Sequence, residues 1–70
     1  MGDVAVATFA GYAEAAMWVE MLKSEGIPAV LVPLGFGAAR GASAGLPHEL
    51  RVREQDANRA RSLLPAQDER

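Results

Sequence analysis

The sequence predicts a small α+β domain with the element order β-α-β-β-α, in which two helices cover one face of a three-stranded, antiparallel or mixed sheet. Three observations predict it. Two segments repeat with the two-residue period of a strand, one short apolar run lies between prolines, and two segments rich in helix formers end at glycine or proline. Seventy residues allow one such domain. We assign it to residues 1–65, followed by a polar tail at residues 66–70.

The first strand is predicted at Asp3–Phe9, where β-branched residues occupy every second position. Gly11 breaks that pattern. The segment Tyr12–Glu25 contains neither glycine nor proline and is rich in good helix formers. Gly26 and then Pro28 are the usual stop signals, so the helix is predicted to end at Gly26. The side chains predicted to face inward are Ala15, Trp18, Val19 and Leu22.

The second strand is predicted at Ile27–Leu34, an apolar run with proline near both ends. This composition suits an edge strand, because proline cannot donate to a ladder. Residues 35–47 hold four glycines and four alanines and are predicted to form a flexible loop. In His48–Arg53, Leu50 and Val52 face one way and the charged residues face the other. That segment is therefore predicted to be the third strand, with one solvent-exposed face.

The last element is predicted to be a helix over residues 53–64, with Ala57, Ala60 and Leu64 facing inward and Pro65 ending it. Its acidic residues lie in the first turn and its arginines lie further along, which matches the helix dipole. A right-handed crossover makes the first two strands parallel. The third strand then fits between them, antiparallel to both. The result is a ferredoxin-like half-sandwich that lacks the final strand.

Composition and charge narrow the classes of function. Nine acidic and seven basic residues give a net charge of −2, which does not favour nucleic acid or an anionic membrane. The chain has no cysteine, and therefore no disulfide and no thiolate. Its apolar runs are far shorter than a membrane span, and Met1-Gly2-Asp3 lacks the basic start of a signal peptide. We expect a cytoplasmic protein with no cofactor and no nucleic-acid or membrane partner.

Short motifs along the chain resemble, in order and spacing, those of one bacterial family. The motifs are a helix ending Leu22-x-x-x-Gly26-Ile27-Pro28, a glycine-rich segment, and Val52-x-x-x-Asp56-Ala57-x-x-Ala60-x-x-Leu63-Leu64. Over Val4–Leu64 the chain resembles a small bacterial domain-of-unknown-function family labelled "putative prokaryotic signal-transducing protein". The resemblance implies a compact α+β fold and a non-enzymatic, regulatory role. Similar sequences often open the second helix with proline, where this chain has Arg53, so that helix start is less firmly set here.

One segment matches a catalytic motif. Gly41-x-Ser43-x-Gly45 has the spacing of the nucleophile elbow of serine hydrolases, and His48 lies just downstream. The elbow requires a strand immediately before it and a helix immediately after it. Here no strand is predicted before Gly41, and Pro47 blocks a following helix. A small serine hydrolase is therefore a remote alternative, and we expect no catalytic residue.

The glycine-rich loop contains a candidate ligand-binding site at Gly35, Gly37, Arg40 and Gly41. Free amides and one arginine suit an anion or a nucleotide phosphate. However, Arg40 stands where a dinucleotide fingerprint requires its third glycine. An inert surface loop is the competing interpretation. No metal site is expected, because the single histidine, His48, has no cysteine to join it and the adjacent carboxylate points to the other side of the strand.

Two surface features have more than one interpretation. Arg51 and Arg53 on the outer face of the third strand suit a solvated face or a contact with a partner protein, and no aromatic pair accompanies them for RNA. Met17 and Met21 lie one helical turn apart, away from the predicted core. Methionine suits adaptable interfaces, and coverage by Trp18 or a loop is the alternative.

These observations favour a non-catalytic regulatory or protein-interaction module. A small-ligand sensor that closes residues 35–47 over an anion or a nucleotide is the alternative function. The two differ in their response to ligands, because a ligand that binds only the native state raises the melting temperature.

The outer edge of the first strand predicts a homodimer. Between Val4 and Phe9 the strand has no proline, lysine or charge, and natural sheets usually protect an exposed edge with such residues. We therefore expect this edge to be covered by its symmetry mate, with candidate interface residues Val4, Val6 and Thr8. Contacts through Met17 and Met21 are the competing geometry.

Single proline substitutions at Ala5, Val6 and Ala7 test the strand-edge dimer. A substitution should dissociate it wherever the replaced backbone N–H points outward from the strand edge, because proline has no N–H to donate. Met17→Glu should leave it intact. Light scattering measures the mass of the protein particle in solution, which separates a monomer from a dimer. A folded monomer at about 100 μM would contradict both geometries, because a dimer formed through either of these surfaces should associate well below that concentration.

Overall fold

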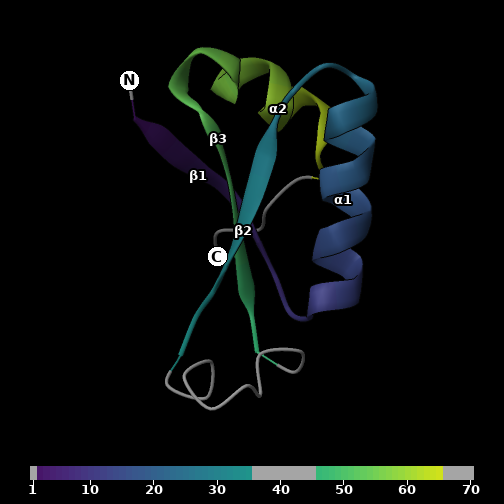
Figure 1. The fold of residues 1–70 in the computed structure, drawn as a ribbon, viewed down its shortest axis with the longest axis vertical. Helices are drawn as coiled ribbons and strands as arrows, with labels where there is room; N and C mark the ends of the chain where they lie inside the picture. Colours follow the sequence, from purple (N-terminus) through teal and green to yellow (C-terminus); the bar gives the residue numbers. More distant parts are fainter. Residues whose placement is uncertain (1, 36–45, 66–70) are drawn as a thin grey trace.

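The computed structural model describes residues 2–35 and 46–65, which form three strands and two helices in the predicted order (Figure 1). The elements are β1 (Asp3–Phe9), α1 (Tyr12–Ser24), β2 (Ala29–Pro33), β3 (His48–Arg53), the short 3₁₀ turn η3 (Glu54–Asp56) and α2 (Ala57–Leu63). The predicted tail at residues 66–70 and most of the predicted loop lie outside the described residues. The predicted fold class is confirmed.

The sheet has the order β1-β3-β2, and the central strand β3 runs antiparallel to both neighbours. This is the predicted topology, in which β1 and β2 are parallel and separated by the third strand. α1 runs along the sheet and packs on all three strands, while α2 packs on β1 and β3 (Figure 1). Of the helices in the described ranges, none is both long and apolar enough to cross a membrane.

The core lies between the sheet and the two helices. All three residues predicted to face inward from α2 are buried, and so are Ala15, Val19 and Leu22 of α1. Trp18 is partly buried and stacks on Phe9, with 6.4 Å between the ring centroids. Four large side chains are fully buried, and each contributes about 1.5–3 kcal/mol to folding relative to an exposed position. They are Leu22, Ile27, Leu50 and Val52.

A Schellman motif ends α1 at the predicted glycine. Gly26 has a φ of 81°, in the left-handed region that glycine adopts without steric penalty. Its N–H donates to the carbonyl of Lys23, and the N–H of Ile27 donates to the carbonyl of Leu22, both at 2.9 Å. Ile27 is therefore part of the helix ending. For this reason β2 begins at Ala29, two residues after the predicted start of the strand.

A β-bulge at Val6 interrupts the alternation of β1. The partners on β3 shift by one position between Ala5 and Ala7, so that Val6 is an extra residue. Val6 and Phe9 are both buried, although strict alternation would place them on opposite faces. Thr8 is exposed. The strand has the predicted bounds, but its β-branched residues do not share one face.

The predicted helix at residues 53–64 begins as η3 and becomes α-helical only at Ala57. Asp56 stands at the N-cap position of α2 but makes no capping hydrogen bond with its side chain. Its carboxylate Oδ2 instead accepts from Nε and Nη2 of Arg53, both at 2.9 Å. The turn before α2 takes the tighter 3₁₀ form, which is common at helix ends.

Arg59 joins the two helices. Its guanidinium donates to the main-chain carbonyl of Glu25 at 2.7 Å and to the carboxylate of the same residue at 3.0 Å. Glu25 is the C-cap residue of α1. A positive charge at this position complements the negative end of the α1 dipole, so Arg59 also stabilises the end of that helix.

Phe9→Ala should lower the free energy of unfolding by about 3–5 kcal/mol, because the ring is buried and stacked on Trp18. Chemical denaturation followed by far-ultraviolet circular dichroism measures this quantity. Met17→Ala is the control, since the Met17 side chain is exposed, and it should change the value by less than about 0.5 kcal/mol. Equal effects of the two substitutions would contradict the inward placement of Phe9 by the bulge.

Candidate functional site

The sheet has a second face, which points away from α1 and α2. No helix or strand among residues 2–35 and 46–65 covers it. We call it the open face. The alternation of each strand assigns to it Asp3, Ala5 and Thr8 of β1, Glu49, Arg51 and Arg53 of β3, and Val30 and Val32 of β2.

A charge network lies at the centre of the open face. Nη1 of Arg51 donates to Oε1 of Glu49 at 2.8 Å, and Nη2 donates to the main-chain carbonyl of Asp3 at 3.0 Å. Nε of Arg51 lies 3.4 Å from Oδ1 of Asp3. The Arg51 and Glu49 side chains are 30% and 26% exposed, respectively. Arg51 is therefore held by groups from two strands while still accessible to a partner.

The network favours the charged form of Arg51, which an arginine already has at neutral pH. The hydrogen bond to Glu49 raises the pKa of the Arg51 guanidinium above its ordinary value; partial burial opposes this, and the charge of Asp3 adds to it. A raised pKa of a basic group stabilises the fold at every pH below the unfolded-state pKa, and this stabilisation is lost only as the pH rises through the folded-state pKa. For an arginine that range lies far above neutrality.

An apolar stripe runs beside the charge network. Three of the five large apolar side chains that are exposed in the described ranges are Val30, Val32 and Leu34, at intervals of two residues along β2 and its continuation. Val30 is 53% exposed and lies opposite Arg51, whereas Val32 is 38% exposed and lies opposite Glu49. The open face therefore combines two neighbouring valines with an ordered network of charged side chains.

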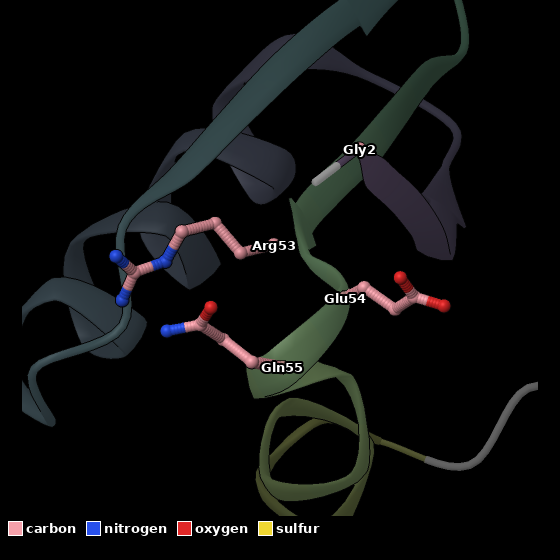
Figure 2. A pocket seen from close by; sticks show the side chains of 4 residues that line it. All are labelled: Gly2, Arg53, Glu54 and Gln55. Atoms are coloured by element: carbon pink, nitrogen blue, oxygen red, sulfur yellow. The ribbon is translucent and has the colours of Figure 1, made fainter.

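Two hollows adjoin the open face. A shallow one of about 130 Å³ lies among Asp3, Val30 and Arg51, and one of about 540 Å³ is lined by Gly2, Arg53, Glu54 and Gln55. In the larger hollow the Arg53 and Gln55 side chains extend to one side, while Glu54 points to the other (Figure 2). Glu54 therefore does not converge with Arg53 and Gln55 on one point.

A comparison with known families identifies the chain. A family model described as "Putative prokaryotic signal transducing protein" matches residues 4–66, which include every helix of the described fold and nearly all of its sheet. The chain belongs to this family. The resemblance found in the motifs is thereby confirmed. Comparison with curated proteins and with solved structures found no match.

The glycine-rich ligand site of this family member stays a prediction. Gly35 has a φ of 107°, a conformation that glycine adopts readily. The other three candidate residues, Gly37, Arg40 and Gly41, lie outside the described residues, and so does Ser43.

His48 has contacts in this family member that sequence reasoning missed. The side chain is buried, and its Nδ1 lies 2.8 Å from the main-chain carbonyl of Leu46. Because a carbonyl only accepts, Nδ1 carries the proton. The ring also meets Tyr12 edge to face, at 5.4 Å between centroids. His48 therefore anchors the start of β3. In the described part of the chain, no group of three or more histidine or acidic residues is placed to hold a metal ion.

The residues predicted to form the interface do not lie on one surface of the domain. Val4 is partly buried against the core and Val6 is buried within it, whereas Thr8 lies on the open face. On α1, Met17 is exposed but Met21 is half-buried. The residues that sequence reasoning overlooked are the valines of β2. Their spacing of two residues indicates that they share one face of a strand. The signal is weak because the whole run is apolar, so the pattern does not show which face is exposed.

Glu49→Gln should loosen the Arg51 side chain, because the shortest contact of the network then loses its negative charge. Solvent exchange of the Arg51 guanidinium protons, measured by NMR, should become faster. Glu54→Gln is the matched control, since the Glu54 side chain points away from Arg53 in Figure 2 and makes no contact with Arg51, and exchange should stay as it was. Identical exchange in all three proteins would show that Glu49 does not hold Arg51.

Proposed function

We propose that this domain is a non-catalytic regulatory module that acts by protein–protein contact in the prokaryotic cytoplasm, with the open face as its binding surface. The observation that carries the proposal is the open face itself, where exposed Val30 and Val32 lie beside a charge network that is already ordered. The description of the family, which names signal transduction, is consistent with this role.

The valines supply the affinity of such a contact. Burial of apolar surface stabilises a complex by about 25 cal/mol for each Å² removed from water. A single exposed apolar residue is common on any protein. Here Val30 and Val32 lie on the same side of one strand, and Leu34 follows at the same spacing. Exposed apolar residues grouped beside polar groups mark interaction sites.

The charge network supplies orientation. Charged groups at an interface contribute more to specificity and to the association rate than to affinity. Because Arg51 is held by Asp3 and Glu49, a partner does not have to order a free arginine side chain on binding. Partial exposure of Arg51 and Glu49 leaves both able to pair with groups of a partner.

The balance of charge favours a protein partner. The open face carries two acidic residues, Asp3 and Glu49, and two basic residues, Arg51 and Arg53. Nucleic acids and anionic membranes are bound by surfaces with an excess of lysine and arginine. A surface with equal numbers of both signs instead suits another surface of mixed charge.

Affinity capture from native lysate tests the proposal. A double variant, Val30→Ser with Val32→Ser, should recover its protein partners at least about tenfold less well than the wild type, which corresponds to a loss of about 1.4 kcal/mol of binding free energy. Neither side chain belongs to the buried core, so the variant should keep the fold at some cost in stability. Met17→Ser, at an exposed methionine on α1, is the matched control and should retain the partners.

Equal capture by the double variant and the wild type would contradict the role of the open face. Capture that is lost only with Met17→Ser would move the binding surface to α1. A melting temperature raised by several degrees by a nucleotide or an anion, in the wild type and in the double variant alike, would favour the ligand-sensor alternative.

A further inference from the structure

We infer that the partner of the open face is a second copy of this chain, which packs against it face to face about a two-fold axis. This inference rests on the proposed role of the open face and names its partner. The argument comes from the positions of the open-face residues in the strand register.

The register arranges the open face in rows that cross the sheet. One row contains Ala5 of β1, Arg51 of β3 and Val30 of β2. The next row contains Thr8, Glu49 and Val32 in the same strand order. The two rows are alike on both outer strands, where small or β-branched residues stand, and opposite in charge at the centre.

A two-fold axis between two copies, parallel to the rows and midway between them, exchanges one row for the other. Each strand then lies over the same strand of the second copy. Arg51 lies over Glu49 of the partner subunit, and Val30 lies over Val32 of the partner subunit. Every such contact occurs twice, because a two-fold interface is isologous. The valines meet valines, and Arg51 and Glu49 each meet the opposite charge.

This arrangement is consistent with how sheets pack. Two sheets that stack face to face keep their strands within about 30° of each other. Residues of neighbouring rows then stay within reach even though each sheet is twisted. In the two rows that meet, the side chains on β1 are small, since Ala5 and Thr8 face the second copy there, so no large group of these rows on β1 holds the sheets apart.

The size of the open face sets the strength of the dimer. Three strands and about six residues of length give a face of about 14 by 20 Å. This is well below the area of about 800 Å² that a standard interface buries on each partner. An interface of this size belongs to the weak, transient class, so we expect association at protein concentrations of about 10 μM to 1 mM.

The open face is a better site for the second copy than the outer edge of β1. The bulge at Val6 interrupts the regular alternation along that strand, and bulges are one of the devices by which proteins prevent pairing at an exposed edge. On the open face, β2 pairs with β3 without interruption.

Sedimentation equilibrium of the purified chain over about 10 μM to 1 mM tests the dimer, since this range covers a weak interface. The wild type should show a monomer–dimer equilibrium. Val30→Ser with Val32→Ser should weaken it at least about tenfold, whereas Met17→Glu should leave it unchanged. A wild type that is monomeric throughout the range would overturn the inference. So would a dimer that the valine substitutions do not weaken.

Charge reversal tests the two-fold geometry itself. The Arg51→Glu variant and the Glu49→Arg variant should each be monomeric when studied alone. Each substitution places two like charges over one another in the dimer. An equimolar mixture of the two variants should form a heterodimer, because the acidic face of one then lies over the basic face of the other. A purely intramolecular role of Arg51 cannot produce this rescue. Two variants that fold, by circular dichroism, yet fail to associate when mixed would overturn the geometry. If either variant does not fold, the valine variants decide.

The tests separate this inference from the proposed function. A chain that is monomeric at 1 mM but still loses a captured protein partner with Val30→Ser and Val32→Ser refutes the dimer and supports the proposed function. A chain that dimerises through the valines supports both.

Discussion

The β-bulge at Val6 is the constraint on which both faces of the sheet depend. Without the extra residue, strict alternation would put Thr8 in the core and Phe9 in solvent. The bulge reverses the alternation partway along β1, so that Phe9 is buried and stacks on Trp18. The same reversal leaves Thr8 on the open face. One inserted residue therefore completes the core on one side of the sheet and keeps a large aromatic ring off the other side.

Local signals in the sequence were sufficient for the element order and the topology. Gly26 marked the end of α1, because the left-handed conformation there favours glycine, and the structure places it in a Schellman motif. The alternation in β3 identified its buried face. The bulge could not be predicted in this way. It is a property of the pairing between β1 and β3, and a single strand with Val4, Val6 and Thr8 at regular intervals gives no sign of it.

The open face was harder to predict than the fold. Arg51 was recognised as exposed, but its contact with Asp3 depends on the register of two strands from opposite ends of the chain. The valines of β2 belong to a run that is apolar on both sides, so the pattern does not say which side is buried. His48 shares the buried face of β3 with Leu50 and Val52, so the alternation places it, but its contact with Tyr12 depends on how α1 packs and is not encoded locally.

The pairing of β1 with β3 also determines when the domain can fold during synthesis. α1 and its glycine ending involve neighbouring residues, so they can form soon after Ile27 leaves the ribosome. β1, by contrast, has no partner strand until β3 is complete at Arg53. Its apolar side chains therefore stay exposed while most of the chain is made, and chaperones bind such segments. The sheet forms late and as one unit, and no shorter nascent chain can carry the open face.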